Sequence, residues 1–242
     1  MEWKIMQKIA QKAKDNFNQG AVTMAFLGDS VTQGCFDIYR KNDGTLETVF
    51  DPEHAYHRYL AKIFSVLFPS VPVNIINAGI SGGNASQGLE RLERDVLCHR
   101  PDLTVVCFGL NDAWRGPDGI ADYTRCLSGI FNALQENGSE VIFMTPNMMA
   151  AEVSCHLPGH FIPDARGAVK VQNDGIMDEY MDAARELCAR MEVPVCDCYA
   201  KWKRLQASGA DVTDLLANYI NHPNRDLNWL FAISLTEMLL EF

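Results

Sequence analysis

The fold class of this chain is decided by residues 22–32, which read Val22-Thr23-Met24-Ala25-Phe26-Leu27-Gly28-Asp29-Ser30-Val31-Thr32. The first six are almost all apolar, which is typical of a parallel strand that is buried on both faces. The Gly-Asp-Ser that follows breaks the strand into a tight turn and leaves Ser30 at its carboxyl end. Open α/β sheets bind their ligands at that edge, so Ser30 is a candidate nucleophile if a base can reach it.

Further apolar segments repeat this pattern along the chain, with amphipathic helices between them. The expected strands are residues 22–27, 73–77, 103–108, 141–145 and 193–198. A helix is expected after Asp51-Pro52-Glu53, with a face of Leu60, Ile63, Phe64 and Leu67, and others over residues 86–96 (capped by Ser86), 120–137, 176–191 and 226–240. This alternation predicts a doubly wound α/β fold with three α/β/α layers and a five-stranded, mainly parallel sheet.

The chain is expected to form one domain over residues 1–242, with residues 1–20 as an N-terminal helical extension. Trp3, Met6, Ala10 and Ala13 fit one face of that helix, which is predicted to end near Gly20. Residues 146–173 are polar, contain Gly and Pro, and are predicted to form a long loop. Because such loops are uncommon in compact domains, this one is expected to shape a binding site.

Composition excludes several classes of function. A chain of 242 residues with 48% hydrophobic and 21% charged residues can bury one large core. The net charge of -10, without a stretch dominated by Lys or Arg, argues against a nucleic-acid or anionic-membrane partner. No segment approaches eighteen apolar residues, and the N-terminus carries charge where a signal peptide needs an apolar stretch, so a cytoplasmic location is expected.

Cysteine and histidine patterns do not predict a metal site. The eight cysteines, at positions 35, 98, 107, 126, 155, 188, 196 and 198, are expected to be free thiols because no export signal is visible. In a strand, Cys196 and Cys198 place both thiols on one face but lack a second zinc-binding pair. His54, His57, His156 and His160 also lack a third ligand and are expected on the surface. Nucleotide-binding glycine motifs are absent, so no cofactor is expected.

Polar segments follow other predicted strands or precede the last predicted helix. They are Asn77-Ala78-Gly79-Ile80-Ser81-Gly82-Gly83-Asn84, Gly109-Leu110-Asn111-Asp112 and Asn221-His222-Pro223-Asn224. Because parallel strands end on the same edge of a sheet, these segments are expected to converge near Ser30. A serine, a histidine, a glycine-rich turn and an asparagine amide are the groups that acyl transfer needs, with the histidine as base and the N–H groups holding the oxyanion.

These four blocks, in this order and after these elements, resemble the SGNH hydrolases, the GDSL-type esterase and lipase family. The resemblance spans Gly28 to His222 and implies that family's flavodoxin-like fold. It also implies that Ser30 is the nucleophile and His222 the base, with the backbone N–H groups of Ser30 and Gly82 and the amide of Asn111 as the oxyanion hole. Each residue also has a purely structural alternative, as a cap, a turn residue or a surface histidine.

The chain departs from the family at the position three residues before the histidine, where the family usually has an aspartate. Tyr219 stands there. Three groups could orient the imidazole instead: the amide oxygen of Asn218, a backbone carbonyl, or Asp214 from an earlier turn. A neutral group is favoured, and because it stabilises the imidazolium less than an aspartate does, a slow hydrolase is expected.

The resemblance implies a metal-free serine esterase that acts on short acyl esters, with an acetyl group on a carbohydrate considered first. Trp114, Trp202 and Trp229 are candidates for stacking on sugar rings, although tryptophan more often packs in a core or at its rim. The alternatives are a lysophospholipase or thioesterase of the same family, a non-catalytic carbohydrate-binding module, which the missing aspartate suggests, and a zinc-dependent hydrolase. No membrane-binding lid is evident, and the oligomeric state stays open.

Overall fold

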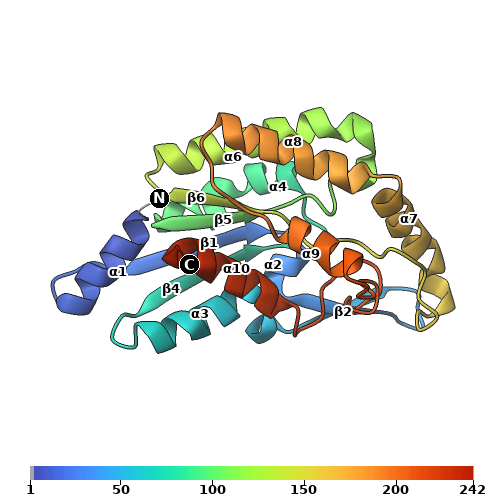
Figure 1. Ribbon diagram of the computed structural model, residues 1–242, viewed down its shortest axis with the longest axis horizontal. Coiled ribbons are helices and arrows are strands. Elements are labelled where there is room, and N and C mark those ends of the chain that lie inside the picture. The colour runs from blue at the N-terminus through green and yellow to red at the C-terminus, as the bar shows by residue number, and fades with distance from the viewer. Residues whose placement is uncertain (1–2, 242) are drawn as a thin grey trace.

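A five-stranded parallel sheet forms the centre of the computed structural model, which describes residues 3–241 (Figure 1). Its strands are β1 (Val22–Gly28), β4 (Val73–Gly79), β5 (Leu103–Cys107), β6 (Glu140–Met144) and β7 (Val195–Cys196). They lie in the order β4-β1-β5-β6-β7, and every neighbouring pair is parallel. This is the doubly wound, flavodoxin-like order, which confirms the predicted fold class.

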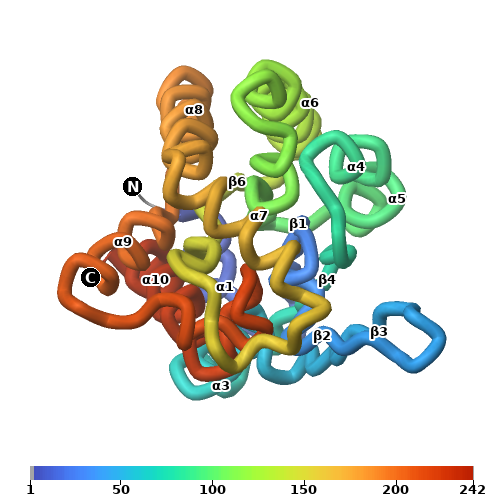
Figure 2. The backbone as a smooth tube through the Cα atoms, turned by 90° about the vertical axis from the view of Figure 1, so that its right-hand side faces the viewer, coloured from blue at the N-terminus to red at the C-terminus, as the bar shows by residue number. Residues whose placement is uncertain are grey.

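Helices cover both faces of the sheet and complete the three layers (Figures 1 and 2). One layer contains α4 (Ala85–Glu90), α5 (Leu92–Asp95), α6 (Ile120–Glu136) and α8 (Ile176–Arg190). The other contains α1 (Lys4–Lys14), α3 (Tyr56–Leu67) and α10 (Asn228–Leu240), with α9 (Cys198–Ala207) beside α10. Two further helices, α2 (Ser30–Gln33) and α7 (Ile162–Asn173), lie at the end of the sheet where the strands terminate. Short 3-10 turns connect some of these elements: η1 (Pro52–His54), η2 (Leu97–His99), η3 (Ala113–Arg115), η4 (Pro117–Gly119) and η5 (Gly159–Phe161).

An antiparallel hairpin follows α2 and was not predicted. It consists of β2 (Cys35–Arg40) and β3 (Leu46–Phe50), and Figure 2 shows it extending away from the sheet. A sequence signal was present, because Asp43-Gly44 is a common hairpin turn and lies between two runs with aromatic and β-branched residues. Gly44 has a φ of 84°, a left-handed conformation that glycine adopts readily.

Several element predictions are wrong in detail. The predicted loop over 146–173 contains α7, whose buried residues are mostly small. The helix predicted over 86–96 is capped by Asn84 rather than Ser86, through a capping box with Gln87, and divides into α4 and α5. The last strand is shorter than predicted, because Asp197 caps α9 by accepting a hydrogen bond from the N–H of Ala200.

The N-terminal helix packs into the core by a different face from the one predicted. Its buried apolar residues are Trp3, Ile5 and Ile9. The expected face is wrong because Met6 is half-buried while Ala10 and Ala13 are exposed. The carboxylate of Glu140 accepts hydrogen bonds from the N–H groups of Lys4 and Ile5, which joins the start of α1 to the first residue of β6, at the amino-terminal end of the strands.

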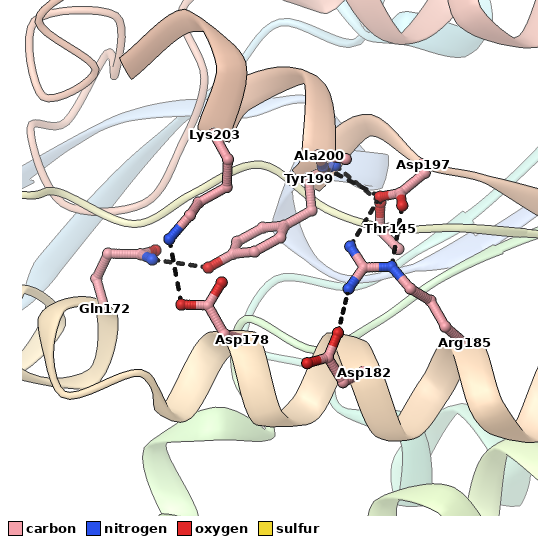
Figure 3. A network of polar contacts seen from close by, with 9 residues as sticks. All are labelled: Thr145, Gln172, Asp178, Asp182, Arg185, Asp197, Tyr199, Ala200 and Lys203. Atoms are coloured by element: carbon pink, nitrogen blue, oxygen red, sulfur yellow. Dashed lines mark hydrogen bonds and ion pairs between the residues drawn. The ribbon is translucent and has the colours of Figure 1, made fainter. Parts of the chain in front are cut away.

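A polar network joins α8, α9 and the loop after β6 (Figure 3). The carboxylate of Asp197 accepts from Arg185 Nε at 2.9 Å and from Thr145 Oγ1 at 3.0 Å, in addition to capping α9. Burial opposes ionisation, but the bonds from Arg185 and Ala200 hold the pKa of Asp197 below its ordinary value. The network therefore fixes the start of α9 against α8.

Candidate active site

Ser30 lies where β1 turns into α2, as the sequence predicts. The turn is tight, since a Cβ on Gly28 would lie 2.1 Å from Thr32 Oγ1 and 2.8 Å from the carbonyl oxygen of Cys107. Asp29 caps α2 by accepting from the N–H of Val31 at 3.0 Å, so Ser30 is the first residue of the helix. Two buried side chains of α3 hold this turn in place. The hydroxyl of Tyr56 bonds to the hydroxyl of Thr32, and the imidazole of His57 bonds to the carbonyl oxygen of Thr32.

Asp29 is a carboxyl group with an unusual environment. It is buried, and desolvation together with the nearby charge of Asp112 raises its pKa to about 7. The hydrogen bond from Val31 opposes this shift but does not cancel it. The proton of Asp29 therefore exchanges near neutral pH, directly beside the candidate nucleophile.

The glycine-rich segment after β4 packs against α2. A Cβ on Gly79 would lie 2.2 Å from the backbone nitrogen of Gln33, so only glycine fits at this approach. The side chain of Gln33 accepts from the N–H of Ser81 at 2.7 Å. Gly82 has a φ of 76° and faces open space, and a hollow of about 460 Å³ lies on the α4 side of this loop. Ser30 does not line that hollow.

Asn111 follows β5 and meets the same loop. Its Nδ2 donates to the carbonyl oxygen of Gly83 at 2.8 Å, while Oδ1 of the neighbouring Asp112 accepts from the N–H of Ala85 at 3.0 Å. An asparagine amide has two N–H donors, so one remains for an oxyanion. The structure thus brings Asn111 to the loop that contains Gly82, as the resemblance implies.

Arg91 connects the end of β1 to the end of β4. It is buried, and its guanidinium donates to the carbonyl oxygen of Gly28 at 2.8 Å and to that of Ala78 at 2.6 Å. These carbonyls lie at the ends of β1 and β4, immediately before the Ser30 turn and the glycine-rich loop. One side chain therefore sets the spacing between the candidate nucleophile and a candidate oxyanion donor.

His222 lies against the start of the hairpin. Its Nδ1 is 3.0 Å from the carbonyl oxygen of Phe36 and 3.6 Å from Cys35 Sγ. Because a carbonyl can only accept, Nδ1 carries the proton and Nε2 keeps its lone pair, which is the tautomer that a general base needs. Burial lowers the pKa of His222 to about 4, so the ring is neutral at pH 7.

Asn218 does not orient the imidazole ring, and this corrects the residue assignment made from sequence. Its Oδ1 accepts from the backbone N–H groups of Ile220, Asn221 and His222, so it organises the loop rather than the ring. Asp214 is exposed at the surface. Of the three alternatives, the contact that the structure contains is the backbone carbonyl, supplied by Phe36.

The candidate base contacts the segment that follows the candidate nucleophile. His222 contacts Cys35 and Phe36, which follow the short helix that Ser30 begins. Across residues 3–241, no hydrogen bond joins the Ser30 hydroxyl to the imidazole. Catalytic hydrogen bonds are often long in proteins without bound substrate and shorten when substrate binds.

The other candidate residues are placed as follows. His57 is buried rather than exposed, which corrects the prediction, whereas His156 and His160 are exposed. All eight cysteines are free thiols, and the sulfur atoms of Cys196 and Cys198 are 3.9 Å apart. In the described part of the chain, no three His, Cys, Asp or Glu side chains converge on a position that could hold a metal ion.

Of the tryptophans considered for sugar stacking, Trp202 is fully buried and unavailable. Trp229 stacks on Tyr59, with ring centroids 4.1 Å apart, and Trp114 is 43% exposed. Among residues 3–241, no helix is both long and apolar enough to cross a lipid bilayer.

A protein-family model agrees with the fold and the arrangement of these segments. The model of the GDSL-like Lipase/Acylhydrolase family matches residues 26–230, and the chain therefore belongs to this family. An acetylxylan esterase of Geobacillus stearothermophilus is 28% identical over 132 residues, which are 51% of this chain and 58% of that protein. An arylesterase of Vibrio mimicus is 36% identical over 73 residues, which are 30% of this chain and 36% of that protein. The matched regions thus cover less than two thirds of either relative.

Solved structures show the same fold. The acetyl xylan esterase AlAXEase superposes with a TM-score of 0.67 at 19% identity, covering 90% of this chain and 100% of that one. A two-domain esterase active on acetylated mannans gives a TM-score of 0.66 at 19% identity, covering 98% of this chain and 52% of that one.

Three groups at the site were missed from sequence. A backbone carbonyl was one of the expected alternatives for orienting His222, but the residue that supplies it was not identified, because the Phe36 carbonyl has no residue-type signature and lies on a hairpin that was not predicted. Arg91 could not be distinguished by sequence from the other charged residues of its predicted helix. In the structure it is buried, whereas Arg94 is exposed. His57 was read as a surface residue because the face of α3 was assigned from its aliphatic side chains alone.

Proposed function

We propose that this chain is a serine esterase that hydrolyses short acyl esters, with acetyl as the acyl group and O-acetylated carbohydrate as the substrate class. The observation that carries the proposal is the contact between His222 and Phe36, which leaves Nε2 free to accept a proton. The low pKa of His222, about 4, keeps that atom unprotonated at neutral pH. Family membership and the esterases among the relatives support ester chemistry.

The proposed reaction has two halves with one acyl-enzyme between them. Ser30 Oγ attacks the ester carbonyl as His222 Nε2 takes its proton, and the N–H groups of Ser30 and Gly82 with the Asn111 amide hold the oxyanion. The bond to the alcohol then breaks, and the alcohol leaves with the proton from His222. Water attacks the acyl-enzyme with His222 again as base, which releases the carboxylic acid and restores Ser30.

His222 has a neutral hydrogen-bond partner, the Phe36 carbonyl, and this affects the expected rate of the reaction. When an aspartate is replaced by asparagine in a Ser-His-Asp triad, much of the loss comes from the wrong imidazole tautomer. The Phe36 carbonyl avoids that loss because it accepts the Nδ1 proton. It does not neutralise the imidazolium, although the negative charge of Asp37 favours the charged ring. We therefore expect an active enzyme with modest turnover.

Hydrolysis of p-nitrophenyl esters from acetate to octanoate tests this proposal. The wild type should favour acetate, and Ser30→Ala should lower kcat/KM by on the order of a thousandfold or more. Ser65→Ala, which changes an exposed serine of α3, is the matched control and should leave the rate unchanged.

Three results would count against the proposal. Undiminished hydrolysis by Ser30→Ala would assign the activity to another group, and a folded wild type without activity would favour a non-catalytic carbohydrate-binding module. A preference for the longest acyl chains would instead favour the lysophospholipase or thioesterase alternative.

A further inference from the structure

A small cleft with a volume of about 270 Å³ is lined by residues that neighbour, along the chain, the groups that contact His222; His222 itself does not line it. Three segments that are far apart in the sequence form its walls: residues 37–39 of β2, residues 156–161 before α7, and residues 217–219 before His222. These segments come together at the end of the molecule that faces the viewer in Figure 2. The predicted loop over 146–173 thus contributes a wall of this cleft.

Two of the segments that line the cleft also contain, or directly follow, a group that is hydrogen-bonded to His222. Phe36, whose carbonyl bonds to His222, precedes Asp37 of the cleft. Asn218, which lines the cleft, accepts from the backbone N–H of His222 at 2.9 Å. A molecule in the cleft therefore lies on the imidazole side of the site.

In the proposed reaction, the leaving alcohol lies on the imidazole side of the site. His222 must give its proton to the oxygen of the leaving alcohol, so the alcohol has to lie next to the imidazole. In the proposed mechanism the carbonyl oxygen of the ester faces Gly82 and Asn111, which meet through Gly83 and do not line the cleft. The cleft is therefore on the side of the alcohol rather than of the acyl chain.

The lining of the cleft combines aromatic rings with a few polar groups. Tyr39 is 54% exposed, and the ring of Tyr219 lies 5.8 Å from that of His156 with a tilt of 35°. Asp37, which also pairs with Arg225 at 3.5 Å, supplies a carboxylate in the same cleft. Aromatic faces pack against the apolar faces of a pyranose ring, and polar groups at the margin bond to its hydroxyl groups.

Tyr219 also has a backbone conformation that bulky residues rarely adopt. Its φ is 53°, in the left-handed region that favours glycine and asparagine. Strained residues of this kind concentrate at ligand sites, where the surrounding structure holds them in place.

We propose that this cleft is a subsite for the pyranose ring of an O-acetylated sugar, with Tyr39 and Tyr219 as its aromatic walls. The inference rests on the proposed esterase function, because it names the part of the substrate that His222 releases. It makes these two tyrosines determinants of specificity for the alcohol and leaves the acyl group to other residues.

Two substrates separate the subsite from the chemistry: an acetylated methyl xylopyranoside, which fills the cleft, and p-nitrophenyl acetate, which lacks a sugar. The ratio of kcat/KM for the first to that for the second should fall about five- to tenfold in Tyr39→Ala and in Tyr219→Gly, through a higher KM. Glycine at position 219 keeps the positive φ accessible. Leu46→Ala, an exposed residue of the same hairpin outside the cleft, should leave the ratio unchanged.

An unchanged ratio in both tyrosine variants would overturn the subsite, as would a change confined to acyl-chain preference. A binding measurement keeps the test independent of catalysis. Xylotriose or mannotriose should bind Ser30→Ala protein, as followed by calorimetry, and more weakly when Tyr39→Ala is added. Binding that is absent, or equal in both proteins, contradicts the subsite, whereas binding without any esterase activity contradicts only the proposed function.

Discussion

At His222, a main-chain carbonyl occupies the place that a carboxylate has in Ser-His-Asp triads. The carbonyl can fix the tautomer, because that requires only an acceptor, but it contributes little to the charged state of the ring. The burial of His222 also works against the charged state, which lowers its pKa to about 4. The base is therefore ready at neutral pH and is a weak one.

This pKa predicts an unusual pH profile. Activity requires neutral His222, so kcat/KM for p-nitrophenyl acetate should not fall through pH 6.5, where an ordinary histidine titrates, but only as the pH approaches about 4. Ionisation of Asp29, whose pKa is about 7, is expected to add a second step to the profile near neutral pH. The profile of Asp29→Asn separates the two, because asparagine still accepts from Val31 but does not titrate. A fall centred near pH 6.5 in both proteins would contradict this account of His222.

Asp29 itself predicts a pH-dependent stability. Its pKa is raised from 3.8 to about 7 in the folded protein, so the folded state keeps a proton that the unfolded state releases. The stability that this carboxyl contributes is therefore fully present below pH 3.8 and is lost as the pH rises toward 7. Asp29→Asn should accordingly gain up to a few kcal/mol over the wild type between pH 4 and pH 8 in urea unfolding. A difference that stays constant with pH would argue that the carboxyl is not desolvated.

At the level of elements, the site is held by contacts between segments rather than within them. Arg91 ties the ends of β1 and β4, and the side chain of Gln33 in α2 holds the glycine-rich loop. The hairpin supplies the carbonyl that accepts from His222. The loop before α7 and the hairpin both line the 270 Å³ cleft.

Replacing Arg91 tests the first of these contacts. Arg91→Met should lower the free energy of unfolding by about 1–3 kcal/mol, because the carbonyl oxygens of Gly28 and Ala78 each lose a charged donor, although Gly28 still accepts from the N–H of Ile80. It should also reduce kcat more than it raises KM, since the spacing of Ser30 and Gly82 changes. Arg94→Ala is the matched control, because that guanidinium is exposed and pairs only with Asp95, and it should cost less than about 1 kcal/mol. Equal losses in the two variants would assign Arg91 to surface electrostatics.

The parts of the fold that the sequence predicts share a physical reason. β1 and β5 are buried on both faces and therefore appear as continuous apolar runs, and α6 ends before Gly138, whose φ of 86° suits a helix terminus. The hairpin has no such run because it is mostly half-buried or exposed. α7 has a weak pattern because it packs through Ala165 and Ala168.

For the site, residue types and spacing predicted which side chains come together but not how they are held. Ser30, Gly82, Asn111 and His222 follow strand ends or precede a helix, where a parallel sheet places them at one edge. The acceptor for His222 is a backbone atom on an unpredicted element, and the assignment of Asn218 failed because its oxygen is already saturated by backbone N–H groups.

At the scale of the whole molecule, the fold brings residues that are far apart in the sequence to the same side. The strands of the central sheet end at the same edge, which places Ser30 there, and the loop before α10 brings His222 from the C-terminal part of the chain to the hairpin that follows α2. The proposed proton transfer requires the Ser30 hydroxyl and the imidazole to come within hydrogen-bond distance, and their positions are set by α2, the hairpin and the loop before α10.

Labelling with a fluorophosphonate, followed by intact-mass and peptide mass spectrometry, tests that approach most directly. The reagent needs a serine that is activated by a base. We predict one adduct per chain, located on Ser30, absent from Ser30→Ala and formed on the order of a hundredfold more slowly in His222→Gln. Labelling of His222→Gln at the rate of the wild type, or an adduct on a residue other than Ser30, would contradict the account.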